Sequence, residues 1–262
     1  MTKRSFSRDG FVSPVPVVAE AEAATHRRAL EMAEDQLGPL HYRNKVHTIL
    51  PSAHELATHP ALLDAVEACI GPDILVYNVT YIIKEPQTAS HVSWHQDLTY
   101  WGLSDADAQV SAWLALAPAT EESGCMRMLA GSHREGPIRH VHTEDATNVL
   151  LMGQTVDTSA TAAAEATLCV LAPGEASLHH GWTVHASGPN LSDDRRIGLN
   201  IQYLAPHNLH TGGGHQSAML ARGEDRHRHF ETDQAPTADL DPAAVDRWEW
   251  LDAMMKDGFL GN

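Results

Sequence analysis

Residues 196–203 read Arg-Ile-Gly-Leu-Asn-Ile-Gln-Tyr, with polar and apolar side chains in alternation. Successive side chains of a β-strand point to opposite faces, so this pattern predicts a half-buried strand. Ile197, Leu199 and Ile201 form its apolar face, and Arg196 lies on the other. A guanidinium in that place can hold a carboxylate through two parallel hydrogen bonds. A solvated surface ion pair is the alternative for this arginine.

Other short β segments precede this strand, separated by turns rich in Pro, Gly and Asp such as Ala172-Pro173-Gly174-Glu175. We expect strands at 74–83, 110–117, 125–129, 149–156, 168–171, 176–179 and 196–204. Strands of this number after a helical layer predict a mainly β protein. The expected fold is a double-stranded β-helix, a jelly-roll or cupin-like barrel with flanking N-terminal helices and a C-terminal helix.

The helical layer is expected before residue 73. A helix at 17–37 ends at Gly38-Pro39, and another begins at Pro60 and ends at Gly71-Pro72. Residues 52–55, Ser-Ala-His-Glu, have the form of a capping box.

The C-terminal helix is expected at 241–256, with Trp248, Leu251 and Met255 on one face for core packing or, alternatively, a dimer contact. We expect one domain over 1–262, with a helical buttress at about 17–71, a barrel core at about 73–205 and an extension at 206–262. Residues 157–167 are interpreted as an excursion between strands and 208–216 as a mobile loop.

A candidate metal site lies in Trp94-His95-Gln96-Asp97. Side chains at i and i+2 of an extended segment share a face, so His95 and Asp97 can bind one metal ion. His185 would complete a two-histidine, one-carboxylate set, which leaves positions open on Fe(II) for a co-substrate and for O2. A chance match is the alternative, because the chain holds 18 histidines.

Several spacings agree with this set. Arg196 follows His185 by eleven residues, Trp113 follows Asp97 by sixteen, and Asn78 precedes His95 by seventeen. A glycine-containing turn at 122–125 and a Gly-Ser-His sequence at 131–133 lie between them. Over about 73–203 the chain resembles the phytanoyl-CoA dioxygenase-like branch of the Fe(II)/2-oxoglutarate oxygenases, which also contains the ectoine hydroxylases.

The resemblance implies a role for each matching residue. The implied metal ligands and catalytic residues are His95, Asp97 and His185. Arg196 would bind the far carboxylate of 2-oxoglutarate, and the other implied co-substrate contacts are Asn78, Trp113 and Ser187. Candidate substrate contacts are Trp101, Tyr100 and Arg222, for which core packing or a surface salt bridge is the alternative.

The expected reaction is hydroxylation or a related oxidation of a C–H bond in a small molecule, with release of succinate and CO2. Related halogenases carry a small residue in place of the acidic ligand, whereas this chain keeps Asp97. We expect His95 and Asp97 at the mouth of the barrel, and His185 on the strand pair that carries Arg196. The rival interpretation is a cupin-like zinc lyase or binding module, since the same ligands suit zinc. That rival has no need of a buried Arg196.

Composition excludes several kinds of partner. The formal net charge is −16, so nucleic acid and anionic membrane surfaces are not expected to bind. No cluster of Lys and Arg offers a cradle for the phosphates of an acyl-CoA. The three cysteines lie far apart in apolar surroundings, as reduced core residues do. We expect a cytoplasmic, soluble monomer or homodimer without a signal peptide or membrane span.

Overall fold

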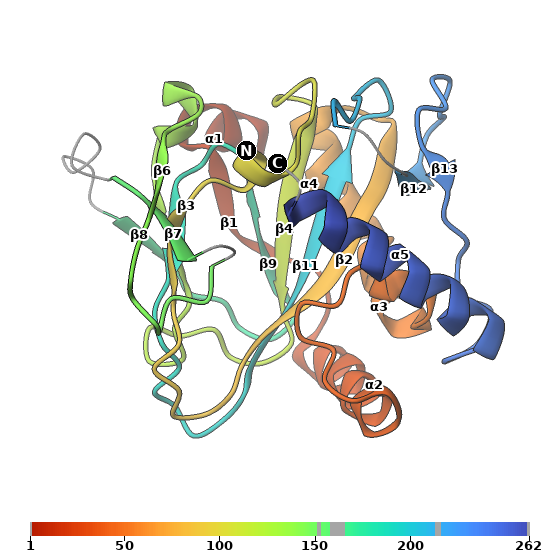
Figure 1. The fold of residues 1–262 in the computed structure, drawn as a ribbon, viewed down its shortest axis with the longest axis horizontal. Coiled ribbons are helices and arrows are strands. Elements are labelled where there is room, and N and C mark those ends of the chain that lie inside the picture. Colours follow the sequence, from red (N-terminus) through yellow and green to blue (C-terminus); the bar gives the residue numbers. More distant parts are fainter. Residues whose placement is uncertain (1, 151–152, 158–165, 213–215, 261–262) are drawn as a thin grey trace.

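Two β-sheets that face each other dominate the computed structural model, which describes residues 2–150, 153–157, 166–212 and 216–260 (Figure 1). The large sheet has the order β1 (Phe11–Pro16), β9 (Glu175–His179), β4 (Gln109–Ala115), β11 (Arg196–Leu204), β2 (Ile74–Lys84), β12 (Ser217–Arg222) and β13 (Glu231–Thr232). The small sheet has the order β3 (Val92–His95), β10 (His185–Ser187), β5 (Met126–Leu129) and β8 (Ala166–Cys169). A separate pair joins β6 (His140–His142) to β7 (Gln154–Val156). This arrangement confirms the predicted double-stranded β-helix.

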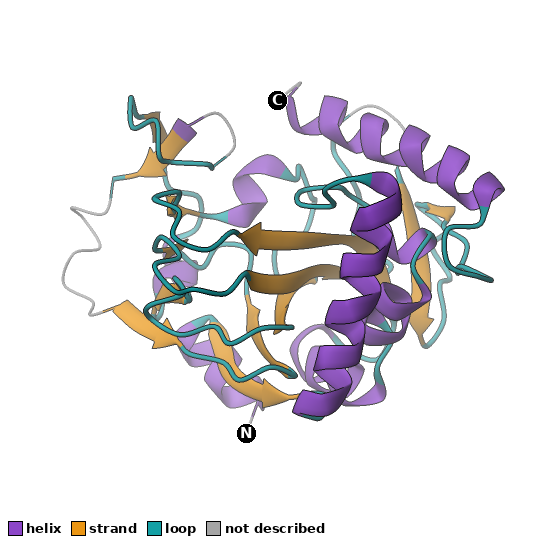
Figure 2. Cartoon of the chain, turned by 90° about the horizontal axis from the view of Figure 1, so that it is seen from below, coloured by secondary structure: helices purple, strands orange, loops and turns teal. Residues whose placement is uncertain are grey.

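Helices cover the outer face of the large sheet (Figure 2). They are α2 (Glu20–Leu37), the short 3-10 helix η1 (Val46–Thr48), α3 (Pro51–Ala57) and α4 (Pro60–Ile70), and α1 (Thr2–Asp9) precedes them. The predicted helix ends are confirmed at Gly38 and Gly71, which adopt φ of 79° and 97° at the C-caps.

The predicted capping box is wrong. Helix α3 begins at Pro51, one residue earlier, with Leu50 as the N-cap and no side-chain cap. A proline at the first position has a φ suited to the helix and lacks an N–H that would need a partner. Ser52 therefore lies inside the first turn, where its Oγ hydrogen-bonds His26 Nδ1 at 2.8 Å.

Strand β11 is buried on both faces, which corrects the expectation of a half-buried strand. Its apolar face packs into the core beneath the helices, where Ile197, Leu199 and Ile201 are fully buried. Its polar face points toward the small sheet, and Arg196 and Gln202 are only 1% and 5% exposed there. Alternation set the two faces correctly, but the second sheet covers the face that an open sheet would show to solvent.

The large sheet extends beyond the expected barrel core of 73–205. Strand β1 adds to one end and β12 pairs with β2 near the other. Prolines 14 and 16 hid β1 in the sequence, yet prolines are tolerated at a sheet edge and at bulges. Here β1 is the edge strand, and its register with β9 shifts between Val12 and Val15.

Other predicted segments differ in extent. Of the strand expected at 149–156, only Gln154–Val156 forms β7, and residues 151–152 lie outside the described part. Most of the excursion at 157–167 and residues 213–215 of the loop at 208–216 also lie outside it.

The C-terminal helix α5 (Pro242–Leu260) packs against the N-terminal region and the rim of the large sheet (Figure 1). Trp248 and Leu251 are 1% and 3% exposed, and Trp248 Nε1 donates to Asn44 O at 2.7 Å. These contacts support core packing for this face. Among the helices described, none is long and apolar enough to cross a membrane.

Candidate metal centre

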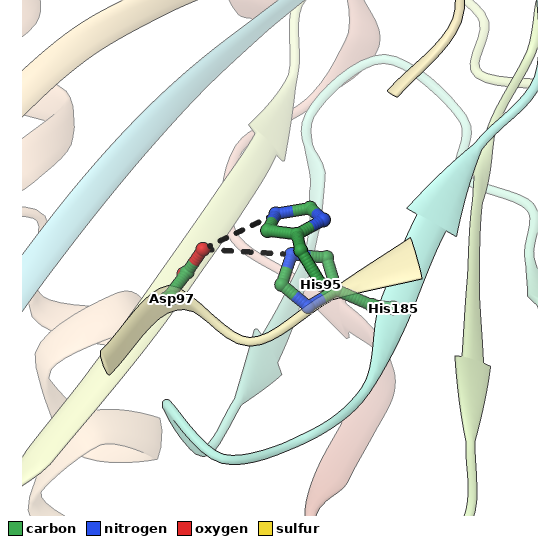
Figure 3. A group of neighbouring side chains, drawn as sticks. All are labelled: His95, Asp97 and His185. Carbon is green, nitrogen blue, oxygen red and sulfur yellow. Dashed lines mark ion pairs between the residues drawn. The ribbon is translucent and has the colours of Figure 1, made fainter. Parts of the chain in front are cut away.

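Three side chains from the small sheet and its connection converge at one point (Figure 3). His95 ends β3 and His185 begins β10, and the two lie directly opposite in register with ring centroids 4.0 Å apart. Asp97 opens the short 3-10 helix η2 (Asp97–Tyr100) that follows β3. The possible ligand atoms of all three lie within 4.8 Å of one another.

The strand that carries His185 differs from the expected one. Strand β10 pairs with β3 and β5 in the small sheet, whereas Arg196 lies on β11 in the large sheet. The expectation that His185 and Arg196 share a strand pair is therefore wrong. The residues between them, 188–195, cross from one sheet to the other.

Hydrogen bonds set the tautomer of both histidines. Nδ1 of His95 lies 2.9 Å from Ser93 O, and Nδ1 of His185 lies 2.9 Å from Thr183 O. A carbonyl oxygen only accepts, so each Nδ1 carries the proton and each Nε2 keeps a free lone pair. Burial, together with neighbouring His95, also holds the pKa of His185 well below its usual value, which favours the neutral ring.

Asp97 faces both free nitrogens. Its Oδ1 lies 3.5 Å from His95 Nε2 and 3.6 Å from His185 Nε2. Burial alone would raise the pKa of Asp97, but His185, His179 and His95 together hold it well below the ordinary value. Two imidazole nitrogens and an ionised carboxylate oxygen therefore face one another at short range. A metal cation fits this donor set.

A cavity of about 360 Å³ opens beside these side chains, between the two sheets. Its walls include every predicted site residue except Arg222: His95, Asp97, His185, Arg196, Asn78, Trp113, Ser187, Trp101 and Tyr100. Asn200, Gln202 and Lys256 also line the cavity and were not predicted. His179 lines it too, and its nearness to His185 in the sequence favours an outer-shell or structural role over metal ligation. Asn200 and Gln202 could have been found, because alternation along β11 places them on the face of Arg196.

Arg196 is a buried cation that lacks a full set of partners. It is 1% exposed, its Nη1 donates to Gly124 O at 2.8 Å, and its Nε has no hydrogen-bond partner among the residues that the structure describes. Its guanidinium carbon lies 4.9 Å from the centre of a Trp113 ring. Burial lowers the pKa of Arg196 to about 10, which still leaves it charged at neutral pH.

A second basic residue, Lys84, lies beside Arg196 and was not predicted. Its Nζ donates to Ser187 Oγ at 2.8 Å and to the carbonyl of Gly188. Burial, then the charge of Arg196, lower the pKa of Lys84 to about 6. Within the described residues, Lys84 Nζ donates to Ser187 and Gly188 and Arg196 Nη1 donates to Gly124 O, so the hydrogen-bond partners of both are uncharged. A bound anion would offset the cost of burying the charge of Arg196, so this end of the cavity suits a carboxylate.

Comparison with known proteins assigns the chain to a family. The model of the phytanoyl-CoA dioxygenase (PhyH) family matches residues 6–198. The chain belongs to this family. The match confirms the predicted resemblance, and it also covers most of the chain before residue 73, where weaker similarity was expected.

Relatives of the PhyH chain include enzymes with different substrates. It is 28% identical over 159 residues to a probable alpha-ketoglutarate-dependent hypophosphite dioxygenase of Stutzerimonas stutzeri, covering 61% of this chain and 55% of the relative. It is 30% identical to a 1-deoxypentalenic acid 11-beta-hydroxylase of Streptomyces arenae, covering 60% of this chain and 58% of the relative. The chain spans about half the length of the curated relatives it matches.

A solved structure titled non-heme monooxygenase ThoJ, in its apo form, is 30% identical with a TM-score of 0.85, covering 100% of this chain and 98% of that one. A second solved structure, CytC3 with Fe(II) and alpha-ketoglutarate, is 21% identical with a TM-score of 0.68. The match covers 92% of this chain and 94% of that one, and at this identity it supports the fold alone. The family match, together with the relatives at 28–30% identity, confirms the expectation that this PhyH chain is an enzyme.

Both polar atoms of the Asn78 side chain, a predicted co-substrate contact, already have hydrogen-bond partners in the protein. Asn78 Oδ1 accepts from Lys45 N, and Asn78 Nδ2 donates to Asn44 Oδ1, each at 2.9 Å. Asn44 also donates, from its backbone N at 2.8 Å, to Asp252 of α5. Asn78 is therefore held by the protein and connects the cavity wall to the C-terminal helix.

The aromatic candidates beside the metal centre are placed as expected, and the basic one is not. Trp101 is 4% exposed, and Tyr100 donates from its hydroxyl to Gln154 Oε1 at 3.0 Å. Arg222 lies on β12 outside the cavity, where it forms 2.8 Å ion pairs with Asp64 and Glu67 of α4. The expected substrate role of Arg222 is thus wrong, because acidic residues on the neighbouring helix hold its guanidinium on the outer surface.

Proposed function

We propose that this PhyH protein is an Fe(II)- and 2-oxoglutarate-dependent dioxygenase that hydroxylates or otherwise oxidises a C–H bond of a small molecule. The observation that carries the proposal is the presence of two complementary features in one cavity. One is the His95–Asp97–His185 donor set, and the other is the buried, incompletely paired Arg196. A zinc site alone needs the first feature and gives no reason for the second.

We assign the metal to Nε2 of His95, Nε2 of His185 and Oδ1 of Asp97. These residues supply three ligands and leave further positions for a co-substrate and O2. When bound, iron together with 2-oxoglutarate supplies the oxidising chemistry that protein side chains lack. The three residues would hold the metal at the edge of the cavity. The hydrogen bonds from Nδ1 of His95 and Nδ1 of His185 fix the orientation of both imidazoles.

Arg196 is proposed to hold the far carboxylate of 2-oxoglutarate. Its unpaired Nε and the stacked Trp113 leave the edge of the guanidinium available for a charge-assisted hydrogen bond. Ser187, kept in place by Lys84, lines the same cavity from β10 of the small sheet and offers a hydroxyl group. Together these residues orient the co-substrate, so that its other end extends toward the metal centre.

The substrate is proposed to be small, and to contact Trp101 and Tyr100 where they line the cavity. At about 360 Å³ the cavity lies near the lower limit of ligand pockets, which span roughly 300–1,000 Å³. It must hold the co-substrate as well, so a whole acyl-CoA does not fit inside. The charge of −16 and the absence of a basic cluster agree with this conclusion.

An anaerobic titration of metal-free protein with Fe(II) and 2-oxoglutarate tests the proposal. The visible charge-transfer band of the chelate should form with the wild type, be lost in Asp97→Ala and need far more 2-oxoglutarate in Arg196→Ala. Arg222→Ala is the matched control, because this arginine lies outside the cavity. Absence of the band, with tight zinc binding in its place, would support the cupin-like alternative.

A further inference from the structure

We infer that His179, together with Ser111, is a positioning residue that reserves one oxygen of Asp97 and leaves only the other for the metal. The inference rests on the metal centre proposed above and adds a requirement to it. It concerns how the carboxylate is held, and therefore how many coordination positions it occupies.

The two residues approach Asp97 from the large sheet. Ser111 on β4 and His179 on β9 are directly opposite in register, and both side chains reach the same carboxylate oxygen. Ser111 Oγ donates to Asp97 Oδ2 at 2.9 Å, and His179 Nε2 lies 3.1 Å from the same atom. Oδ1, by contrast, lies 3.5 and 3.6 Å from Nε2 of the two metal-ligating histidines, which are its ion-pair partners in the described part of the chain.

The surroundings of His179 decide which nitrogen carries its proton. The side chain is 2% exposed, and its Nδ1 has no hydrogen-bond partner within the described structure. A proton on Nδ1 would leave a buried donor unsatisfied, whereas a proton on Nε2 is donated to Asp97. Nε2 of His179 is therefore a donor and is not available as a fourth histidine ligand.

Two donors on Oδ2 have a consequence for the metal. They use the directions from which this oxygen would accept, so the carboxylate presents Oδ1 alone. A carboxylate that bound through both oxygens would occupy one more coordination position. Two-histidine, one-carboxylate centres depend on open positions for their co-substrate, and His179 and Ser111 protect one of them here.

Metal binding to the metal-free protein tests this directly, with Co(II) as the probe. We expect His179→Leu to bind Co(II) about 10- to 100-fold more weakly, the range typical for loss of a hydrogen-bond partner of a ligand. The visible Co(II) spectrum should also change, because its intensity depends on coordination number and geometry. His179→Gln can place an N–H near the position of Nε2 and should restore both properties in large part.

Two neighbouring residues give matched controls. His180 is equally buried but its Nε2 lies 3.2 Å from Asp107, away from the metal centre. Ser177 lies two residues before His179 on β9, is fully buried and has no hydrogen-bond partner for its hydroxyl. His180→Leu and Ser177→Ala should keep the wild-type Co(II) spectrum, whereas Ser111→Ala should alter it.

The outcomes separate this inference from the proposed metal centre. If His95→Ala binds Co(II) as well as the wild type does, the metal centre itself is wrong. If His95→Ala loses Co(II) while His179→Leu and Ser111→Ala keep wild-type affinity and spectrum, only the positioning role is wrong. Should His179→Leu fail to fold, Ser111→Ala and His179→Gln still decide, because both retain most of the local packing.

Discussion

A methyl group added at residue 198 should disturb both the fold and the co-substrate end of the cavity. Gly198 lies on β11, and the indole of Trp113 rests against its Cα. A Cβ at this position would lie 1.9 Å from Cζ2 of Trp113 and 2.0 Å from Cε2. Ordinary carbon contacts are about 3.5–4.0 Å, so in Gly198→Ala the indole must withdraw by roughly 1.5 Å.

The expected effect has two parts. Trp113 is only 3% exposed, so it has little room to move, and overpacking of this kind costs about 1–3 kcal/mol of unfolding free energy. The displaced ring also leaves the Arg196 guanidinium, a contact worth about 0.5–2 kcal/mol. Loss of about 1 kcal/mol of that contact would weaken 2-oxoglutarate binding roughly fivefold.

Denaturant unfolding and the anaerobic charge-transfer titration measure these two effects separately. Gly188→Ala is the matched control, since a Cβ there meets nothing closer than Gly124 Cα at 3.9 Å. It should leave both quantities near their wild-type values. Wild-type stability and 2-oxoglutarate affinity in Gly198→Ala would refute the placement of the Trp113 ring against Gly198 and beside the Arg196 guanidinium.

Three further outcomes are expected. Metal at 100 times its dissociation constant should raise the free energy of unfolding in urea by about 2.7 kcal/mol over that of the EDTA-treated protein. Asp97→Ala should remove this increase, and an unchanged increase would contradict the ligand assignment. Burial lowers the pKa of His47 to about 3, so below pH 6.5 the unfolded chain binds a proton that the folded chain does not. Stability should fall by about 2 kcal/mol between pH 6.5 and 5 on account of this group, and urea unfolding of His47→Leu should show a correspondingly shallower pH dependence. Arg222→Gln breaks ion pairs with half-exposed or exposed carboxylates, so unfolding free energy should fall by less than about 1 kcal/mol and 2-oxoglutarate affinity should not change.

The sequence predicted the parts of the site that depend on local geometry. His95 and Asp97 are two residues apart, and alternation along residues 196–203 placed Arg196 on the face opposite Ile197, Leu199 and Ile201. The fold class followed from the number of short strands after a helical layer. These features could be predicted because they depend on the spacing of side chains within a single segment.

Contacts across the sheets could not be predicted in the same way. His179 meets Asp97 across 82 positions of sequence, and only the antiparallel register of β9 with β4 puts Ser111 opposite it. The same limit applies to β11, because alternation cannot reveal that a second sheet covers its polar face. Arg222 was predicted as a substrate contact for the same reason, because the sequence does not show that acidic residues of α4 form ion pairs with it on the outer surface.

Part of the cavity lining comes from residues beyond the family match, on β11 and on the C-terminal helix. The family match ends at residue 198, yet Asn200, Gln202 and Lys256 complete the lining. Asp252 ties α5 to this wall through Asn44, so the helix and the cavity must change together. A change at Lys256 on α5 is thus expected to alter what the cavity admits, while the three metal-binding residues, which lie within the family match, stay as they are.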